Sequence, residues 1–283
     1  MERARISIVT PSLNQGRFVE RTLASVLGQR YPRLEFILMD GGSTDGTAEL
    51  LRRYRRHFAY LESTPEVGPT TPVQRGLARA GGEILAVLGM GEMLAPSTLD
   101  FVTWYFAEHP RVDMIYSHRL LVDEADRVIG HVLLPPHRHR NMRRHPLIPP
   151  ETAFFRRGLY EQAGGVDPAM QAISNFELYL RFMAIGKLAR ADRFLAAHRV
   201  LPTSRATHRM EAVGAEELTQ LRAELPRGPW QEFQDWRLIQ SIVWRSDRFV
   251  RSGRTKPGAW PGMGYSYDEI WAGTLSNPRD GGV

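Results

Sequence analysis

Short apolar runs alternate with amphipathic stretches along the first half of the chain. Each run is short enough for one strand, and each amphipathic stretch repeats its apolar residues at helical spacing, as Val19, Leu23 and Val26 do. Strands are predicted over Ile6 to Val9, Phe36 to Met39, Tyr60 to Glu62 and Glu83 to Leu88. Helices are predicted over Ala48 to Arg56, Val73 to Ala80 and Ser97 to Glu108, besides the one that holds Val19. This alternation predicts βαβ units and a mostly parallel sheet in an α/β fold.

The pattern changes in the second half of the chain. Short strands are predicted at Met114 to Ser117, Leu120 to Val122 and Val128 to Gly130, and helices at Ser174 to Phe182 and Glu211 to Val250. The segment Pro135 to Pro150 is a basic loop without periodicity. The tail from Arg254 to Val283 is rich in glycine and proline, and we expect it to pack on the domain or to be partly disordered. The sequence therefore predicts one α/β domain over residues 1–210 and a helical extension with a tail over residues 211–283.

Two helix starts carry the pattern of a capping box. Ser97 is followed three residues later by Asp100, and Ser174 is followed by Glu177. In such a box each of the two side chains bonds a backbone N–H at the other end of the first helical turn. We expect both pairs to cap their helices.

An acidic turn with paired glycines joins the second predicted strand to the next helix. The turn reads Asp40-Gly41-Gly42-Ser43-Thr44-Asp45-Gly46-Thr47. Asp45 is placed to cap the helix and Asp40 is left free to accept hydrogen bonds, while the glycines let a ligand approach the backbone. Strand, turn and helix in this order form the geometry in which α/β proteins bind ligands. An ordinary capped β–α connection also fits the same residues.

Composition narrows the class of protein. A chain of 283 residues with 42% apolar composition has enough apolar surface for a hydrophobic core. The absence of cysteine excludes disulfides and thiolate metal sites, and it fits a reducing compartment. No targeting segment precedes the first strand, and no apolar run approaches the roughly 20 residues of a membrane span. We expect a cytoplasmic protein with at most peripheral membrane contact.

The net charge of +6 comes almost wholly from arginine, because Lys187 and Lys256 are the only lysines. Arginine suits phosphate binding, although an arginine bias also follows from genome composition. The basic residues are scattered, do not alternate with aromatic residues and form no nucleic-acid motif. We therefore expect no nucleic-acid partner.

Five segments of the chain match, in order, the motifs of one enzyme family. They are Ile6 to Gln15, Ser25 to Pro32, Asp40 to Thr47, Arg75 to Ile84 and Phe154 to Asp167. Together they resemble the family-2 inverting glycosyltransferases, which are nucleotide-sugar enzymes with the GT-A fold. The resemblance covers roughly Ile6 to Arg205, and it implies a GT-A-type α/β domain here.

The resemblance also implies substrates. The donor would be a nucleotide-diphosphate sugar, expected to be a UDP-sugar, and the acceptor hydroxyl would belong to a glycan or a lipid-linked glycan of bacterial surface-glycan or glycolipid synthesis. Residues 1–112 would hold the nucleotide and residues 113–210 the acceptor. Asp40 would contact the base. The implied nucleotide-binding residues are Thr10, Pro11, Ser12, Asn14, Asp40, Gly41, Gly42, Arg75, Gly89 and Met90.

The metal motif of the family is altered in this chain. Family members neutralise the leaving diphosphate with Mn²⁺ or Mg²⁺ on an Asp-rich motif after the fourth strand. Here that position reads Gly89-Met90-Gly91-Glu92, with Gly91 where the ligating Asp would stand. A single carboxylate binds a hard cation poorly. Glu92 is therefore either a weak metal ligand or a solvated residue at a helix start, and we expect the second.

The position of the catalytic base is altered as well. The family places an acidic residue just before an aromatic–acid–Leu–aromatic–Leu–Arg run, and this chain has Asn175 there. Asn cannot accept a proton at neutral pH, and Glu177, two residues on, points about 200° away on a helix. Asn175 and Glu177 are the candidate catalytic residues, although the capping box explains Glu177 better than catalysis does.

These departures define an alternative function. Thr71 and Gln74 also stand where the family usually has Asp and Asn, so the altered positions concentrate on the active centre. The alternative is a glycosyltransferase-shaped protein that has lost catalysis and serves as a binding or partner subunit. A nucleotidyltransferase is a third interpretation, but the chain lacks a glycine- and lysine-bearing phosphate loop.

Two basic segments have more than one interpretation. The run His137 to His145, with Arg143 and Arg144, fits a clamp for a diphosphate or lipid phosphate, a histidine metal site or a solvated loop, and we favour the solvated loop. The stretch Trp236 to Arg248 combines an apolar stripe with arginines. It fits a membrane-surface helix, but a helix that packs on the core or joins a homo-oligomer explains the stripe better.

Overall fold

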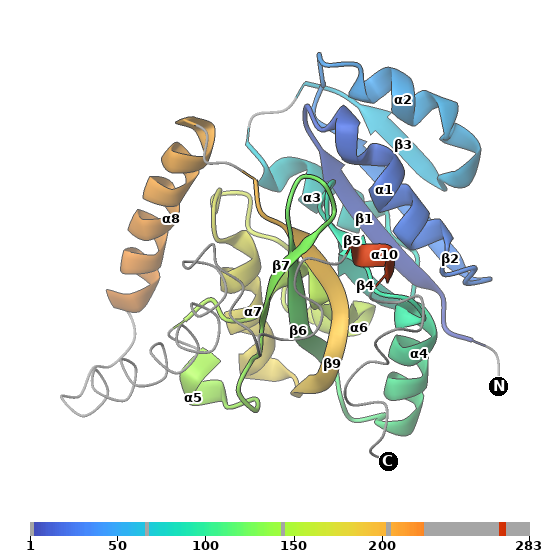
Figure 1. Cartoon of the computed structure of the whole chain (residues 1–283). Coiled ribbons are helices and arrows are strands. Elements are labelled where there is room, and N and C mark those ends of the chain that lie inside the picture. Colours follow the sequence, from blue (N-terminus) through green and yellow to red (C-terminus); the bar gives the residue numbers. More distant parts are fainter. Residues whose placement is uncertain (1–2, 66–67, 143–144, 202–204, 224–265, 270–283) are drawn as a thin grey trace, which may run out of the picture.

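The computed structural model describes residues 3–65, 68–142, 145–201, 205–223 and 266–269 (Figure 1). Its strands are β1 (Ile6–Ser12), β2 (Leu34–Asp40), β3 (Tyr60–Ser63), β4 (Ile84–Val87), β5 (Met93–Leu94), β6 (Met114–Val122), β7 (Val128–Val132), β8 (Phe154–Arg156) and β9 (Leu188–Arg199). Its α-helices are α1 (Gly16–Leu27), α2 (Thr47–Arg53), α3 (Thr70–Arg79), α4 (Thr98–Glu108), α5 (His139–Met142), α6 (Arg157–Gln162), α7 (Ser174–Ile185), α8 (Arg205–Ala223) and α10 (Tyr267–Glu269). Short 3-10 turns cover Arg55–His57 and Pro150–Thr152.

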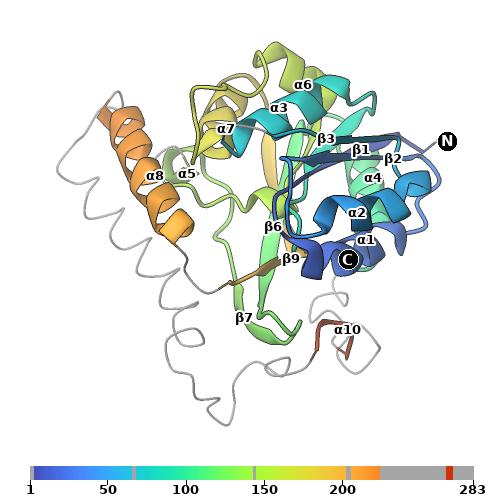
Figure 2. The same ribbon diagram turned by 90° about the horizontal axis from the view of Figure 1, so that it is seen from above.

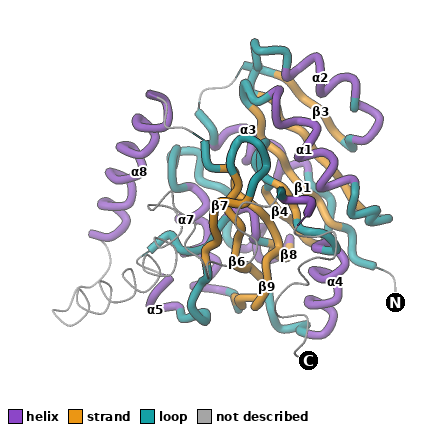
Figure 3. The backbone as a smooth tube through the Cα atoms, in the orientation of Figure 1, coloured by secondary structure: helices purple, strands orange, loops and turns teal. Residues whose placement is uncertain are grey.

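All the described strands belong to one sheet. Their order is β3-β2-β1-β4-β8-β6-β9-β5, and β7 pairs with β6 outside this path. The first four strands of this order run parallel, as the alternation of strands and helices predicts. Beyond β4, only β6 and β9 pair in parallel, because β8 runs against both of its neighbours and β5 and β7 each run against theirs. The α/β fold is confirmed, with a sheet that is mixed and that curls at β7 and β9 (Figure 3).

Helices cover both faces of the parallel half, which explains its continuous apolar runs. Helices α1, α2 and α4 lie on one face, and α3, α6 and α7 lie on the other (Figure 2). Alternate residues of each strand enter the two cores: in β2, Phe36 and Leu38 pack with α1, while Ile37 and Met39 pack with α3. Full burial of one such side chain contributes roughly 1.5–3 kcal/mol.

Neither predicted capping box forms. Ser97 precedes α4 with a left-handed φ of 58° and makes no capping hydrogen bond, and Asp100 pairs instead with Arg3 at 2.6 Å. Ser174 is the first residue of α7 rather than its cap. The backbone N–H groups before α7 are already occupied, because residues 171–173 all donate to the Glu217 carboxylate at 2.7–3.1 Å. A carboxylate distant in sequence thus takes the place of the local cap.

The helical extension begins earlier than predicted. Helix α8 starts at Arg205 instead of Glu211 and, in the described part of the chain, ends at Ala223. It stands apart from the sheet and meets the domain at the segment before α7, through Glu217 (Figure 1). The predicted apolar and arginine-rich stretch from Trp236 to Arg248 lies outside the described residues. No helix within the described ranges is long and apolar enough to cross a membrane.

A short piece of the tail returns to the domain, as expected for a tail that packs on it. Tyr267 is buried, and its hydroxyl donates to the Leu94 carbonyl of β5 at 2.6 Å. Ser266 forms a bridge with Arg127 after the β6–β7 turn, and Asp268 pairs with Arg21 of α1 at 3.0 Å. The tail residues 266–269 therefore join β5, α1 and the β6–β7 hairpin.

Candidate functional site

The carboxyl ends of β1, β2 and β4 carry the candidate ligand loops. These strands are parallel neighbours, and their register places Ser12 of β1 opposite Asp40 of β2. In open α/β sheets, ligands bind beyond the carboxyl ends of the strands. The loops after these strands therefore begin at the place where the sequence predicts a nucleotide.

The loop that follows β2, here called the Asp40 loop (residues 40–47), satisfies its own carboxylates. Asp40 is only 2% exposed, and it accepts hydrogen bonds from the Ser43 N–H at 3.0 Å, the Ser43 hydroxyl at 2.5 Å and the Ser63 hydroxyl at 2.6 Å. The prediction that Asp40 is free to bond is thus wrong for this conformation. The strand end positions the carboxylate as expected, but the hydroxyls of Ser43 in the loop and of Ser63 in β3 already bond its oxygens.

Asp45 and Asn14 tie the Asp40 loop to the loop after β1. Asp45 accepts the N–H groups of Thr47, at the start of α2, and of Gly16, at the start of α1. The N-cap residue of α2 is Gly46, so Asp45 bonds the helix start from one residue before the predicted cap position. Asn14, with φ 51°, accepts the Thr44 N–H at 2.8 Å. The hydrogen bond from the Thr47 hydroxyl holds the pKa of Asp45 below its usual range. The two loops form one hydrogen-bonded unit.

The other predicted nucleotide-binding residues near these strand ends differ in whether the fold already uses their polar groups. The hydroxyls of Thr10 and Ser12 are buried and have no hydrogen-bond partner among the described residues. Gly41 donates to the Ser12 carbonyl at 2.8 Å. Gly42 has φ 82°, and a side chain there would collide with Pro65, so this glycine is required by the fold itself.

The turn after β4 is held by backbone and side-chain bonds from three other elements. Met90 donates to the Pro11 carbonyl, and Gly91, with φ 100°, donates to the Thr22 hydroxyl. The buried guanidinium of Arg199, at the end of β9, donates to the Gly91 carbonyl at 3.1 Å. The turn is therefore fixed in a conformation that favours glycine at position 91.

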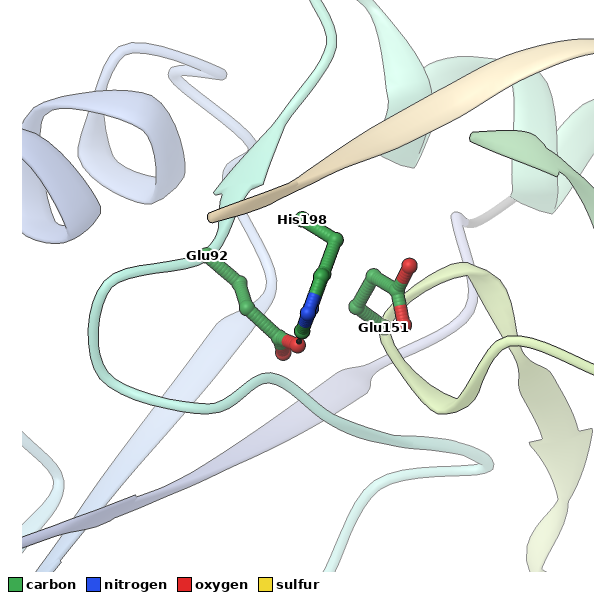
Figure 4. A group of neighbouring side chains, drawn as sticks. All are labelled: Glu92, Glu151 and His198. Carbon is green, nitrogen blue, oxygen red and sulfur yellow. Dashed lines mark hydrogen bonds and ion pairs between the residues drawn. The ribbon is translucent and has the colours of Figure 1, made fainter. Parts of the chain in front are cut away.

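Glu92 ends this turn and meets two residues that the sequence did not single out. Its carboxylate accepts the Gly89 N–H at 2.7 Å and lies 3.0 Å from Nδ1 of His198, at the end of β9. Glu151, from the 3-10 turn before β8, completes a group whose ligand atoms all lie within 4.8 Å of one another (Figure 4). We call Glu92, Glu151 and His198 the Glu–His cluster. The prediction of Glu92 as a solvated residue at a helix start is wrong, because its side chain is 17% exposed and precedes β5.

Glu151 is the most buried member of the Glu–His cluster. Its side chain is 0% exposed, and Arg119 reaches one of its oxygens at 3.3 Å. The other oxygen, Oε2, has no hydrogen-bond partner in the described part of the structure. A buried carboxylate oxygen without a partner is rare and costly, so it marks a group that a ligand can complete.

The electrostatics of the cluster favour an added positive charge. Burial raises the pKa of the Glu151 carboxyl, and the Glu92 carboxylate raises it further against the opposing charges of Arg119 and His198. Burial alone would lower the pKa of His198, but the hydrogen bond with Glu92 and the nearby carboxylates outweigh it, so this pKa is raised. The two carboxylates thus favour the protonated form of the imidazole when no other cation is near.

A pocket of about 430 Å³ opens beside the cluster. It is lined by Pro11 at the end of β1, by Gln15 from the loop that follows, by residues 89–92 and by residues 198–201. The pocket is large enough for part of a drug-sized ligand, and it joins the predicted nucleotide loops to the Glu–His cluster.

The two predicted catalytic residues lie on different faces of α7. Asn175 precedes Tyr179 by one helical turn, so both are on one face. Burial raises the pKa of the Tyr179 hydroxyl, and the carboxylates of Glu151 and Glu92 raise it further. Glu177 forms a two-pronged ion pair with Arg181 at 2.5–2.6 Å. Arg181 also donates to the Ala163 carbonyl, after α6.

The predicted basic contacts are only partly described. Arg75 of α3 pairs with Glu62 at the end of β3. Arg143 and Arg144 lie outside the described residues. In the same loop, His137 lies 2.9 Å from the Tyr116 hydroxyl, and burial and the charge of His139 lower its pKa to about 4. Within the described ranges, the histidines of this loop take part in no group of metal-binding side chains, since the Glu–His cluster is the one such group.

Glu151 and His198 were missed because the sequence separates them. Glu92 and His198 are 106 positions apart, and no pattern along the chain brings them together. One signal was present: Glu151 is a charged residue between the proline pair 149–150 and the apolar run that begins at Ala153. A carboxylate just before a buried strand is itself expected to be buried, and a buried carboxylate is almost always paired with another group. This expectation makes Glu151 a candidate for a binding site.

The sequence matches one protein family and several named relatives. The model of the family described as Glycosyl transferase family 2 matches residues 7–162. The putative teichuronic acid biosynthesis glycosyltransferase TuaG of Bacillus subtilis is 38% identical over 88 residues, which is 29% of this chain and 34% of that protein. This chain thus spans about a third of the length of that relative. A PGL/p-HBAD biosynthesis glycosyltransferase of Mycobacterium bovis is 25% identical over 185 residues, or 64% of this chain and 70% of the relative.

Solved structures share the fold at low sequence identity. The mannosyltransferase PcManGT of Pyrobaculum calidifontis, in complex with GDP-Man and Mn²⁺, has a TM-score of 0.61 and 20% identity and covers 88% of this chain and 73% of its own. TarS of S. aureus, in complex with UDP-GlcNAc, has a TM-score of 0.62 and 15% identity and covers 90% of this chain and 77% of its own. These likenesses confirm the predicted GT-A fold class.

Proposed function

The chain belongs to glycosyl transferase family 2, and from this premise we propose that it transfers a sugar from a nucleotide-diphosphate sugar to an acceptor hydroxyl, with inversion. The bond between the anomeric carbon and the diphosphate oxygen breaks, and the acceptor oxygen takes its place while losing its proton. The observation that carries the proposal is the family match over residues 7–162, which contains the loops after β1, β2 and β4. The relatives are named as glycosyltransferases, which favours an enzyme over a binding subunit without catalysis.

The donor we propose is a UDP-sugar held at the carboxyl ends of β1 and β2. Asp40 would accept a hydrogen bond from the base, and Thr10, Ser12 and Asn14 lie along the neighbouring loop. Asp40 already accepts three hydrogen bonds, from Ser43 and Ser63, so a base N–H would have to share or displace one of them. Structural neighbours were solved with UDP-GlcNAc and with GDP-Man, so guanine is the alternative base.

The diphosphate is expected in the pocket beside the turn after β4. Gly89 and Gly91 give that turn no side-chain oxygen for a cation, so the family's Asp motif cannot act here. The Glu–His cluster borders the same pocket and offers two carboxylates and an imidazole, which fit a divalent cation. When bound, such a cation would offset the negative charge of the leaving group. The residues of this chain that orient the pocket are Pro11 and Met90, through their backbone bond.

The acceptor hydroxyl must lose its proton during transfer. Asn175 lies in the first turn of α7, one turn before Tyr179, but an amide accepts no proton at neutral pH. Glu177 can accept one, but its ion pair with Arg181 holds it on the other face of α7. We propose that Asn175 orients the acceptor by hydrogen bonding, and that uptake of the proton by solvent or by Glu177 makes transfer slow.

The acceptor class we propose is a bacterial surface glycan or a glycolipid. The supporting observation is the naming of relatives after teichuronic acid and PGL/p-HBAD biosynthesis. Residues 1–112 would bind the donor, and residues 113–210, with Arg143 and Arg144, would bind the acceptor or its phosphate. A lipid-linked acceptor would bring the protein to the cytoplasmic face of a membrane through peripheral contact.

Calorimetric titration of the full chain with UDP tests the donor site. A hydrogen bond to a charged group contributes about 1.5–3 kcal/mol, so Asp40→Ala should weaken binding by about tenfold to a hundredfold. Asp100→Asn on α4 is the matched control, because its exposed carboxylate pairs only with Arg3 in the described structure and should leave affinity unchanged. Equal affinity in the Asp40 variant removes this residue from the site. A wild-type chain that binds neither UDP nor GDP refutes the donor site itself.

A further inference from the structure

Three side chains from three separate segments meet at one end of the sheet. Glu92 comes from the turn after β4, Glu151 from the 3-10 turn before β8 and His198 from the end of β9 (Figure 4). Their ligand atoms all lie within 4.8 Å of one another. We propose that these three residues bind one divalent transition-metal ion, in place of the Asp motif that the family uses. This inference rests on the proposed function only for what the ion would do.

The unpaired oxygen of Glu151 is the strongest support for a ligand. A carboxylate with no exposed surface needs hydrogen bonds or an opposite charge on both oxygens, and Arg119 reaches only Oε1. Oε2 has no hydrogen-bond partner among the described residues. A cation between Glu151 and the other two residues supplies that missing partner.

Glu92 and His198 are already held in place for the same ion. The Gly89 N–H binds Glu92 Oε2, so this oxygen is fixed and Oε1 faces Nδ1 of His198 at 3.0 Å. Bonds of about 2.0–2.2 Å from one ion to a carboxylate oxygen and an imidazole nitrogen place those two atoms about 3 Å apart. The pair thus needs little movement to chelate, and Glu151 closes the third side.

The combination of two carboxylates and one imidazole favours some divalent metals over others. Two carboxylates balance the charge of one divalent ion, and the imidazole adds a neutral nitrogen ligand. Mg²⁺ and Ca²⁺ prefer oxygen alone, whereas Mn²⁺, Fe²⁺, Co²⁺ and Zn²⁺ accept imidazole with carboxylate. We therefore expect Mn²⁺ or Zn²⁺ to bind more tightly than Mg²⁺.

The ion would border the pocket that the predicted nucleotide loops share. Glu92 and His198 both line that pocket beside Pro11, whereas Glu151 closes the cluster from behind. A diphosphate in the pocket would complete the coordination of the ion from the open side. The cluster therefore offers a metal to the leaving group even though Gly91 offers no carboxylate.

Mn²⁺ binding to the full chain, without nucleotide, tests the site directly. We would titrate the metal-free protein with Mn²⁺ and follow the electron paramagnetic resonance signal of the free ion. One ion should bind per chain, and a roughly tenfold excess of Mg²⁺ should not displace it. Glu151→Gln and His198→Gln keep the side-chain size and should each weaken binding by at least about tenfold. If Glu151→Gln fails to fold, the less buried Glu92→Gln serves as the third variant.

Asp192→Asn is the matched control. Asp192 also holds a carboxylate oxygen 2.9 Å from a histidine nitrogen, in His118, but the pair belongs to no three-residue group within the described ranges. Its Mn²⁺ affinity should equal that of the wild type. Wild-type protein that binds no Mn²⁺, or cluster variants that bind it as tightly as the wild type, would overturn the proposal.

A second measurement separates this proposal from the proposed function. Wild-type protein that shows full transfer activity in EDTA and binds no Mn²⁺ would reject the metal site and leave the transferase standing. Mn²⁺ bound by the wild type but lost in the cluster variants, with no affinity for any nucleotide, would keep the metal site and reject the donor site.

Discussion

Two groups of carboxylates lie near the carboxyl ends of the same parallel strands, and they are treated in opposite ways. In the Asp40 loop, backbone N–H groups and serine or threonine hydroxyls bind the carboxylates of Asp40 and Asp45. In the Glu–His cluster, the most buried carboxylate, Glu151, keeps an oxygen without a partner in the described structure. The first group stabilises the empty fold. The second keeps a carboxylate oxygen that no other part of the described structure binds and that a ligand could bind.

The difference shows at which of the two groups a ligand can bind with the smaller loss of existing hydrogen bonds. A ligand that binds Asp40 competes with three hydrogen bonds that the fold already makes, so its net gain is small. A cation at Glu151 breaks no bond of the Oε2 atom and relieves the repulsion between two carboxylates. The resemblance to the family therefore points to the Asp40 loop as a site. The buried, unpartnered oxygen of Glu151 points to the Glu–His cluster.

The largest expected effect comes from adding a carboxylate in the first turn of α7. Asn175→Asp should raise the rate of sugar transfer by about 10²–10⁴-fold, which is the usual gain from a general base. Transfer would be measured with a panel of nucleotide sugars, with and without Mn²⁺. Asn175→Leu, of similar size but without a proton acceptor, should give no gain. Brisk transfer by the wild type, unchanged in Asn175→Asp, would show that the chain has another base.

Gly91 is not a suitable second position for such a restoration. Its φ of 100° lies where side chains are strained, at a cost of about 1–3 kcal/mol for Asp. The turn after β4 adopts a conformation that favours glycine at position 91, where the family has its metal-binding Asp. Restoring Gly91→Asp together with Asn175→Asp would mix a gain in ligands with a loss of stability.

Asp40→Asn should give the next largest effect, a loss of stability. The variant keeps the size of the side chain but removes the charge that Ser43 and Ser63 bind, and hydrogen bonds to a charged group contribute about 1.5–3 kcal/mol. Urea unfolding would measure the loss. An unchanged free energy of unfolding would mean that the Asp40 loop is less tightly satisfied than its geometry indicates, and the comparison would fail.

Glu151→Gln is the same chemical change in the Glu–His cluster, and it should have the opposite sign. Without metal, removing a buried charge that faces Glu92 should leave stability unchanged or raise it by about 1 kcal/mol. The same urea experiment in EDTA measures the difference from Asp40→Asn. A loss as large as that of Asp40→Asn would show that Arg119 already satisfies Glu151.

Glu177→Gln should have a smaller effect. It removes an ion pair with Arg181 in which the two side chains are 14% and 31% exposed, for a loss of about 1 kcal/mol of stability. Transfer activity should change little if Glu177 acts as a structural partner. A rate loss of a hundredfold or more, with the fold intact, would make Glu177 the base.

The smallest expected effect on stability belongs to the basic loop. Replacing Arg143 and Arg144 together by Ala should alter the free energy of unfolding by less than about 0.5 kcal/mol. Binding of an anionic acceptor or of the diphosphate should fall if these residues form a clamp. Arg52→Ala, an exposed arginine of α2, controls for the loss of surface charge. A double variant that behaves like the wild type in every assay would make the loop a solvated connection.

The sequence predicted the parallel half of the fold well, because both faces of β1, β2 and β4 are covered and their apolar runs are unmistakable. It missed β9, which is rich in alanine and holds three charged residues, Arg190, Asp192 and Arg193, within four positions. That segment is a strand because it pairs with β6 and β5. Pairing with distant segments overrides weak local preference.

The candidate site was predictable only where it follows one stretch of chain. Asp40 and Asp45 were found because strand, turn and helix are consecutive. The capping boxes failed because the two acidic residues have other partners that the local pattern does not contain: Asp100 pairs with Arg3, and Glu177 pairs with Arg181. Glu151 and His198 join Glu92 only through the sheet order, and that order is set by long-range packing.

The contact of Tyr267 with Leu94 has a consequence for how the chain folds. Strand β5 is the last in the sheet order, and an outer strand with free backbone groups can recruit another copy of the chain. The hydroxyl of Tyr267 occupies the Leu94 carbonyl, across a separation of 173 residues. Contacts over such long separations form late, since closing a long loop costs chain entropy first. The sheet is therefore most open to intermolecular strand pairing before the tail arrives, and a chain cut ahead of residue 266 should aggregate during refolding more readily than the intact one.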